Sequence, residues 1–329
     1  MRRRDFITMI SGAVAAWPLA AEAQQADRMR RVGVLMGVPQ ADLEGQRWVR
    51  KFIQTLREAG WKNGTNVQID LRFSQDVRQM RAFGKELIDL QPEVIHVTTG
   101  IATGEIVRQT STIPIVFSMV NDPVALGFVD SLMLPGRNVT GITNIEPSLP
   151  EKWLGLLKEI APRISRVTAL FSPATAYQLT QRWGQMETAA AALGLKVDQT
   201  PVKDNAEIEK AIADLGEAKA GFIMIPDRFF SLGRTFLVIE QAARHRVPAV
   251  YPARDFVDAG GLASYAVDFP DLQRRAALYV DHILKGQTPA ELPVQAPIKF
   301  ELVINAKAAK ALDITLPPKL LARADEVIK

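Results

Sequence analysis

The chain has 329 residues, 47% of them hydrophobic, so it can bury a sizeable core, and its length favours two domains over one. It contains no cysteine, which excludes disulfides, thiolate metal sites, cysteine nucleophiles and a lipid-modified cysteine anchor. The net charge of +4 permits nucleic-acid binding, but Lys and Arg are scattered among acidic residues, and we therefore expect no nucleic-acid partner.

Residues 1–23 have the pattern of an export signal peptide. A basic segment, Arg2–Arg4, precedes an apolar stretch of small residues, and Ala21-Glu-Ala23 fits a cleavage site that would leave Gln24 as the mature N-terminus. Arg3-Arg4 resembles a twin-arginine signal, and an ordinary Sec signal is the alternative. No later stretch reaches the ~20 apolar residues of a membrane span. The sequence predicts a periplasmic protein without a lipid anchor.

After the signal, apolar strands alternate with amphipathic helices, which is typical of an α/β fold. Two stretches of the chain follow the same plan. The first predicts strands at 31–36, 66–73, 93–97 and 115–117, helices between them, a short helix at 124–134 and a last strand at 139–143. The second predicts strands at 167–171, 196–202, 220–225, 248–251 and 262–265, again separated by helices. An amphipathic helix over 272–283, a strand at 299–304 and a final helix at 318–328 complete the chain.

Matching features of the two stretches recur at a nearly constant offset. Gly60 and Gly194 both end a helix, Pro114 and Pro248 both precede a short apolar strand, and each pair is 134 positions apart. A constant offset indicates an internal duplication and two similar lobes rather than one continuous sheet. We expect an N-terminal lobe at 30–144, completed by part of 268–305, and a C-terminal lobe at 145–267. Residues 268–329 would then form a hinge crossover and C-terminal helices.

Polar residues follow the apolar strands of both lobes. In open α/β sheets, ligands bind at the carboxyl ends of the strands, and helix N-termini there suit a carboxylate or phosphate. Asp122 and Asp227 could accept from a ligand ammonium, and tyrosines could supply aromatic walls. Each residue alone is equally explained as a helix cap, a turn former or part of the core. The expected ligand contacts are Thr99, Gly100, Ser118, Asn121, Asp122, Asn144, Ser172, Thr175, Asp227, Tyr251 and Tyr265.

Motifs for catalysis are missing from the sequence. It has no glycine-rich nucleotide loop and no G-x-S-x-G elbow. His96, His245 and His282 have no metal-ligand spacing, and we interpret them as structural. We therefore expect no catalytic residue, no metal and no cofactor.

Several short motifs, taken together, resemble one family along nearly the whole mature chain. They include Pro114-Ile-Val-Phe with Asp122-Pro123, Pro135-Gly-Arg-Asn-Val-Thr-Gly141 and Tyr251-Pro-Ala-Arg-Asp-Phe256 with Ala259-Gly-Gly261. Lys299-Phe-Glu-Leu-Val-Ile-Asn305 and the tail Leu320-Leu-Ala-Arg-Ala-Asp325 belong to the same pattern. The chain is similar to ABC-transporter substrate-binding proteins of the tryptophan-type family.

This resemblance implies a type I periplasmic binding fold, with two Rossmann-like lobes of parallel sheets joined by a hinge. It implies a small solute, such as an amino acid, an aromatic compound or a related organic acid, bound in an interlobe cleft and delivered to a membrane permease. We expect a monomer.

Other classes of protein are weighed against this interpretation. A sensor that binds solute without feeding a transporter has the same sequence features and stays open. An exported two-lobe enzyme is a weaker alternative, because its nucleotide loop or acid/base pair is missing. A transcription regulator of this fold would need a DNA-binding helix-turn-helix where the export signal stands.

Overall fold

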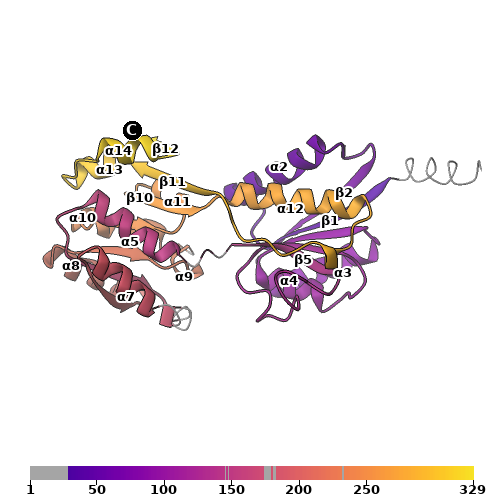
Figure 1. The fold of residues 1–329 in the computed structure, drawn as a ribbon, viewed down its shortest axis with the longest axis horizontal. Coiled ribbons are helices and arrows are strands. Elements are labelled where there is room, and N and C mark those ends of the chain that lie inside the picture. Colours follow the sequence, from indigo (N-terminus) through magenta and orange to yellow (C-terminus); the bar gives the residue numbers. More distant parts are fainter. Residues whose placement is uncertain (1–28, 145, 147, 174–178, 181–182, 232) are drawn as a thin grey trace, which may run out of the picture. The chain divides into compact units, whose positions relative to one another are not determined.

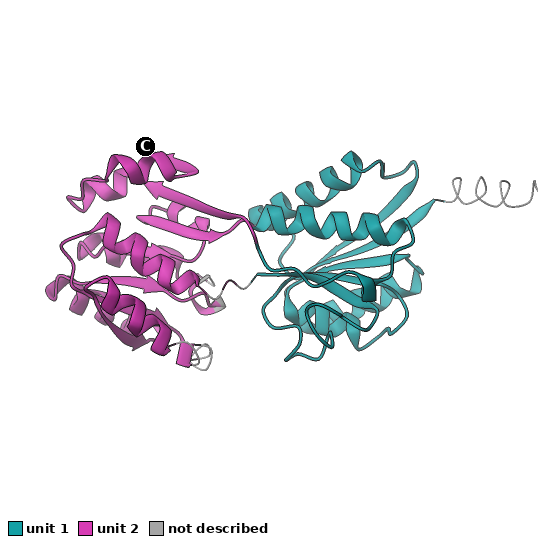
Figure 2. Cartoon of the chain, viewed as in Figure 1, with its two compact units in different colours: residues 1–145, 269–297 teal, residues 146–268, 298–329 magenta. Residues whose placement is uncertain are grey.

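The computed structural model describes residues 29–329 apart from 145, 147, 174–178, 181–182 and 232, so the export signal expected at 1–23 lies outside the described residues. The chain forms two compact units (Figure 2). Unit 1 comprises residues 1–145 and 269–297, and unit 2 comprises residues 146–268 and 298–329. The chain therefore passes between the units three times, after residues 145, 268 and 297.

Unit 1 is built on a five-stranded, fully parallel sheet with the order β2-β1-β3-β4-β5 (Figure 1). Strands β3 and β5 are buried along their whole length, as continuous apolar runs require, and β4 is buried except at Met119. The strands are β1 (Arg30–Met36), β2 (Val67–Phe73), β3 (Val94–Thr98), β4 (Ile115–Val120) and β5 (Val139–Thr143). The helical segments are α2 (Leu43–Glu58), α3 (Val77–Asp89), α4 (Gly100–Val107), α12 (Phe269–Leu284) and the 3-10 turn η2 (Pro289–Glu291).

The helices of unit 1 begin at polar caps that the sequence supplies. Asp42 accepts a hydrogen bond from the Gly45 amide and starts α2, and Asp76 accepts one from the Gln79 amide and starts α3. Helix α12 arrives from the far end of the chain and packs against α2 and strands β3 to β5.

Unit 2 has a seven-stranded sheet with the order β12-β11-β10-β9-β8-β6-β7, in which only the β10–β11 pair is antiparallel. The strands are β6 (Arg166–Phe171), β7 (Lys196–Pro201), β8 (Gly221–Met224), β9 (Ala249–Tyr251), β10 (Ala263–Val267), β11 (Phe300–Asn305) and β12 (Glu326–Ile328). The helices are α5 (Leu149–Ile160), α7 (Trp183–Ala192), α8 (Asn205–Glu217), α9 (Arg228–Ser231), α10 (Thr235–Arg244), α11 (Arg254–Asp258), α13 (Ala306–Ala311) and α14 (Pro318–Arg323).

The two sheets share one topology. The order β7-β6-β8-β9-β10 in unit 2 repeats the order β2-β1-β3-β4-β5 of unit 1, with parallel pairing throughout. The strand after Pro114 and the strand after Pro248 both take the fourth place. The predicted fold class, two α/β lobes with parallel sheets, is confirmed.

Two predicted helices are wrong. Residues 124–134 form turns, with Gly127 at φ 69° and Pro123 at the start, so no continuous helix develops between β4 and β5. The helix predicted at 318–328 ends at Arg323. Its last residues turn extended and pair as β12 with β11, because the neighbouring strand offers them a hydrogen-bonded edge.

Gly141 shows why one glycine is needed inside a strand. A Cβ at this position would lie 2.2 Å from the Phe117 carbonyl oxygen, so only glycine allows β5 to approach β4. Within the described part of the chain, no helix is both long and apolar enough for a membrane span.

Candidate functional site

In each unit, the parallel strands end at one edge of the sheet, and most of the predicted ligand contacts lie there. Each unit presents its own set of groups. Thr175 lies outside the described residues.

Thr99 and Gly100 form the start of α4 at the end of β3. Thr99 has φ 72°, a region unusual for a β-branched residue, and its hydroxyl accepts from the Ala102 amide at 3.5 Å. Its own N–H donates to the Ser118 carbonyl at 3.0 Å, which ties this cap to β4. Gly100 therefore opens a helix whose first amides point out of the end of the sheet.

Gly37, which directly follows the strand predicted at 31–36 and is not among the expected ligand contacts, belongs to the same edge. Its amide donates to the Thr98 hydroxyl at 2.8 Å, and a Cβ here would lie 2.3 Å from the Thr99 hydroxyl oxygen. Only glycine lets the end of β1 approach the α4 cap so closely. The signal in the sequence was a glycine directly after a buried strand.

Ser118 is buried, which corrects the expectation that its hydroxyl faces a ligand. The residue is 0% exposed, and its Oγ lies 3.0 Å from the side-chain nitrogen of Gln273 on α12. Gln273 also bonds to His96 on β3. The hydroxyl is used inside unit 1 and has no surface to offer to a solute.

Asn121 and Asp122, in contrast, are exposed directly after β4. The Asp122 carboxylate accepts from the Ala125 amide at 3.0 Å and so caps the turn that follows. Asn144 follows β5, and its Oδ1 atom is buried without a hydrogen-bond partner among the described residues. These three side chains are the polar groups that unit 1 adds beyond the α4 cap.

In unit 2, the structure brings Ser172 and Asp227 together. The Ser172 hydroxyl at the end of β6 donates to Asp227 Oδ2 after β8, and the Phe229 amide donates to Asp227 Oδ1 at 2.7 Å. Both oxygens of the carboxylate thus have a donor, which fixes its orientation. A carboxylate has about four lone-pair sites, so Asp227 retains the capacity for a further donor.

Tyr251 is a core residue, which corrects its predicted place in a binding wall. It is 1% exposed, stacked on Phe256 with ring centroids 5.3 Å apart, and edge-on to Phe222 at 5.8 Å. Burial raises the pKa of its hydroxyl well above the usual value, so it stays neutral. A ring enclosed by two others in this way cannot contact a solute.

Tyr265 lies on β10, the strand beside β9, and is half-buried. Its ring stacks on Phe300 with centroids 5.6 Å apart, and the Lys152 ammonium lies 5.9 Å from the Tyr265 centroid and 4.8 Å from that of Phe300. Sequence reasoning missed Lys152 and Phe300, because their contact with Tyr265 depends on three separate elements. Together they form an aromatic surface with a cation on it.

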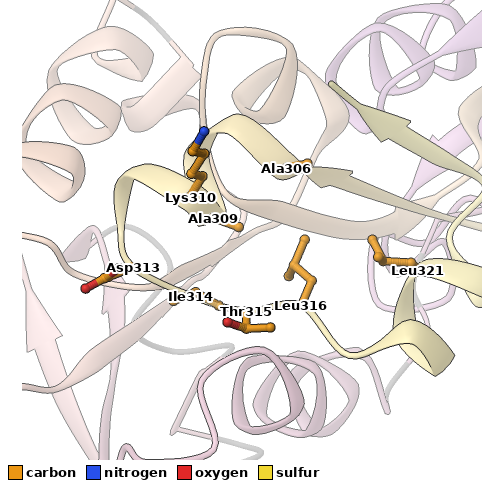
Figure 3. A pocket seen from close by; sticks show the side chains of 8 residues that line it. All are labelled: Ala306, Ala309, Lys310, Asp313, Ile314, Thr315, Leu316 and Leu321. Atoms are coloured by element: carbon orange, nitrogen blue, oxygen red, sulfur yellow. The ribbon is translucent and has the colours of Figure 1, made fainter.

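A shallow cavity of about 340 Å³ lies elsewhere in unit 2, around α13 and α14 (Figure 3). It is lined by Ala306, Ala309, Lys310, Asp313, Ile314, Thr315, Leu316 and Leu321. None of the predicted ligand contacts belongs to it. Within the described ranges, no group of three or more His, Asp or Glu side chains is arranged to hold a metal ion.

Comparisons with known proteins agree on one family. Residues 42–328 match the family model described as ABC transporter substrate binding protein. The chain is 23% identical over 288 residues to a tyrosine-binding protein of Clostridioides difficile (strain R20291), covering 87% of this chain and 82% of the relative.

Two solved structures are similar to most of the chain. The ABC domain in complex with L-Trp from Streptococcus pneumonia has a TM-score of 0.76 and 26% identity, over 91% of this chain and all of the other. A conserved domain protein from Vibrio cholerae has a TM-score of 0.75 and 27% identity, with the same coverage.

Proposed function

The chain belongs to the family of ABC transporter substrate-binding proteins, and we propose that it binds an amino acid with an aromatic side chain or a closely related small solute. Relatives named for tyrosine binding and for a complex with L-Trp support this choice of solute. The observation that carries the proposal is the set of polar groups at the carboxyl ends of the parallel strands in both units.

The proposed roles follow from the charges of an amino acid. The first amides of α4, at Gly100 and Ile101, would bind the solute carboxylate, because a helix N-terminus carries partial positive charge and free donors. Asp227, already oriented by Ser172, would accept from the solute ammonium. Asn121, Asp122 and Asn144 remain proposed contacts of unit 1, and Ser118 and Tyr251 do not.

Tyr265 and Phe300 would provide an aromatic surface for the side chain of the solute. That the solute lies in a cleft between the lobes, as the family resemblance implies, is part of this proposal. We assign no catalytic step to the chain.

The partners in the proposal are the solute and an ABC transporter permease, with the protein acting as a monomer in the periplasm.

Export rests on the pattern of residues 1–23. Replacing Arg3 and Arg4 by lysine should block a twin-arginine route and leave a Sec route nearly unaffected. If the route is the twin-arginine one, cell fractionation would show the precursor of the lysine variant retained in the cytoplasm. An uncleaved cytoplasmic protein in the wild type would contradict export by either route.

A thermal-shift screen of the mature chain tests the solute. The probes are the twenty amino acids and a set of aromatic and aliphatic organic acids. A ligand at 100 times its dissociation constant stabilises the native state by about 2.7 kcal/mol. We expect L-tryptophan or L-tyrosine to raise the melting temperature, and a response only to compounds without an amino group would contradict the proposed role of Asp227.

A further inference from the structure

Gln273, in the second turn of α12, has a side chain that is 0% exposed and joins two strands of unit 1. Its amide lies 2.8 Å from His96 Nε2 on β3 and 3.0 Å from Ser118 Oγ on β4, and 3.9 Å separates its nitrogen from the Met119 sulfur. Nothing in the proposed solute contacts includes Gln273. Its side chain nevertheless contacts the buried end of β4 at Ser118.

The proton positions in this network follow from chemistry. His96 Nδ1 lies 3.0 Å from the Val116 carbonyl, which can only accept, so Nδ1 carries a proton. Burial lowers the pKa of His96 to about 4, so the ring is neutral near pH 7 and Nε2 must accept. The Gln273 NH2 therefore donates to His96 Nε2, and its amide oxygen accepts from the Ser118 hydroxyl, which requires the half-turn of the amide that glutamine readily makes. Every polar atom of the network is then paired.

The network fixes a strand end that is irregular. The register of β4 against β5 shifts between Ser118 and Val120, and Met119 has φ 61°, the left-handed region that favours glycine. Such a conformation persists in a non-glycine residue only where the surroundings determine it. Gln273 contributes to that determination, because it holds Ser118 on one side of the irregularity.

Ser118 is also linked to two of the proposed solute groups of unit 1, the α4 cap and residues 121–122. Its carbonyl accepts the Thr99 N–H at 3.0 Å and so holds the α4 cap, and Asn121 and Asp122 follow it after Met119 and Val120. A shift of Ser118 would move the α4 amides and the exposed side chains together.

We propose that Gln273 is a positioning residue of the solute site: by bridging His96 and Ser118 it holds the bulged end of β4, and with it the α4 cap and residues 121–122, in binding geometry. The expected effect of Gln273 on solute affinity rests on the proposed function. The expected effect on the end of β4 does not depend on any solute.

The test compares two buried anchors of the same helix. Gln273→Met keeps the length of the side chain and removes its amide. The control is Asp281→Asn, because Asp281 is 5% exposed, accepts from the Trp61 indole N–H at 2.8 Å, and ties the later part of α12 to the segment after α2. Asp281→Asn removes the charge that pairs with Lys285, while its amide oxygen can still accept from Trp61, so it perturbs α12 without touching β4.

Two readouts are expected to separate the variants. In the ligand-free protein, Gln273→Met should shift the backbone amide resonances of residues 118–122 and speed their hydrogen exchange at least tenfold, whereas Asp281→Asn should leave them unchanged. In calorimetry with L-tryptophan and L-tyrosine, Gln273→Met should weaken binding at least tenfold, and Asp281→Asn should stay within twofold of the wild type.

If Gln273→Met does not fold, Ser118→Ala removes the other end of the same bond and should give the same pattern. Unchanged amides at 118–122, or equal losses of affinity in both α12 variants, would overturn the proposal. If the wild type binds neither amino acid, the proposed function fails, and the exchange measurement still decides the role of Gln273.

Discussion

Strands β4 and β9 occupy the same place in their sheets, follow a proline each, and end in opposite ways. The end of β4 is polar, bulged at Met119 and held by a buried hydrogen-bond network. The end of β9 is a buried tyrosine enclosed by aromatic rings. The same sequence pattern, an apolar run that breaks into polar residues, therefore produces a polar strand end in one unit and a core residue in the other.

The difference comes from what packs behind each strand. Behind β4 lies α12, whose Gln273 is 155 residues from Ser118 and brings a buried amide. Tyr251 at the end of β9 packs instead against Phe222 on the neighbouring strand β8 and Phe256 on α11. The duplicated sheet determines where a strand ends, and the side chains that pack against that end, from helices and from the neighbouring strand, determine whether it is polar or apolar.

The largest expected effect is the removal of the Tyr251 ring. Tyr251→Ala should lower the free energy of unfolding by about 3–5 kcal/mol, because it leaves a cavity among packed rings. Urea denaturation measures the loss. Tyr251→Phe is the control: it keeps the ring, and solute affinity should stay within twofold of the wild type. A tenfold loss of affinity in Tyr251→Phe would show that the Tyr251 hydroxyl contributes to solute binding, and the ends of β4 and β9 would then be alike in function.

A smaller effect is expected at Asp227. Asp227→Asn removes the charge that the proposed solute ammonium would meet, and a charge-assisted hydrogen bond is worth about 1.5–3 kcal/mol, or roughly 10- to 100-fold in affinity. Calorimetry with L-tryptophan and L-tyrosine gives the affinity. The matched change in unit 1 is Asp122→Asn, at the end of β4. Equal losses in both variants would show that the two units contribute alike, and no loss at Asp227 would reassign its carboxylate to a structural cap for Ser172 and Phe229.

Acid should weaken unit 1 through His96, a group that has no counterpart at the end of β9. Burial lowers the pKa of His96 to about 4, against about 6.5 in an unfolded chain. Between these values the unfolded state binds the proton and the native state does not, so the free energy of unfolding falls as pH drops from 6.5 towards 4, by up to about 1.4 kcal/mol per pH unit. The contribution of the neutral His96 ring to the free energy of unfolding is fully present above pH 6.5. The histidine C2–H resonance reports the native pKa directly, and a midpoint near 6.5 would contradict the buried neutral ring.

The smallest effect concerns the turn after β4. Asp122→Ala removes the bond to the Ala125 amide and should lower the free energy of unfolding by about 1 kcal/mol, because the group is exposed and water replaces the lost acceptor. Denaturation of Asp122→Ala and Asp122→Asn side by side measures it. A loss as large as that of Tyr251→Ala would mean that this turn, too, is part of a packed core.

Much of the fold could be predicted from local pattern alone. The apolar runs before Ser118, Ser172 and Asp227 mark buried strands and their ends, and the shared spacing of Pro114 and Pro248 marks the duplication. The turns at 124–134 could have been suspected from Gly127. The strand β12 could not, because residues 326–328 pair only once β11 offers an edge.

The candidate site was less predictable, since it depends on partners distant in sequence. Ser118 and Tyr251 have the right residue types after the right strands, and only Gln273 and Phe256 show that both are enclosed. Ser172 and Asp227 were each expected at a strand end, whereas their hydrogen bond to one another required the order of the strands.

Chemical-shift mapping of a bound amino acid tests the central claim most directly. We expect saturating L-tryptophan or L-tyrosine to shift the backbone amides of residues 99–101, 119–122 and 227–229, and to leave that of Tyr251 nearly unchanged. Shifts confined to residues 306–321, around the shallow cavity of unit 2, would contradict a solute site at the carboxyl ends of the parallel strands.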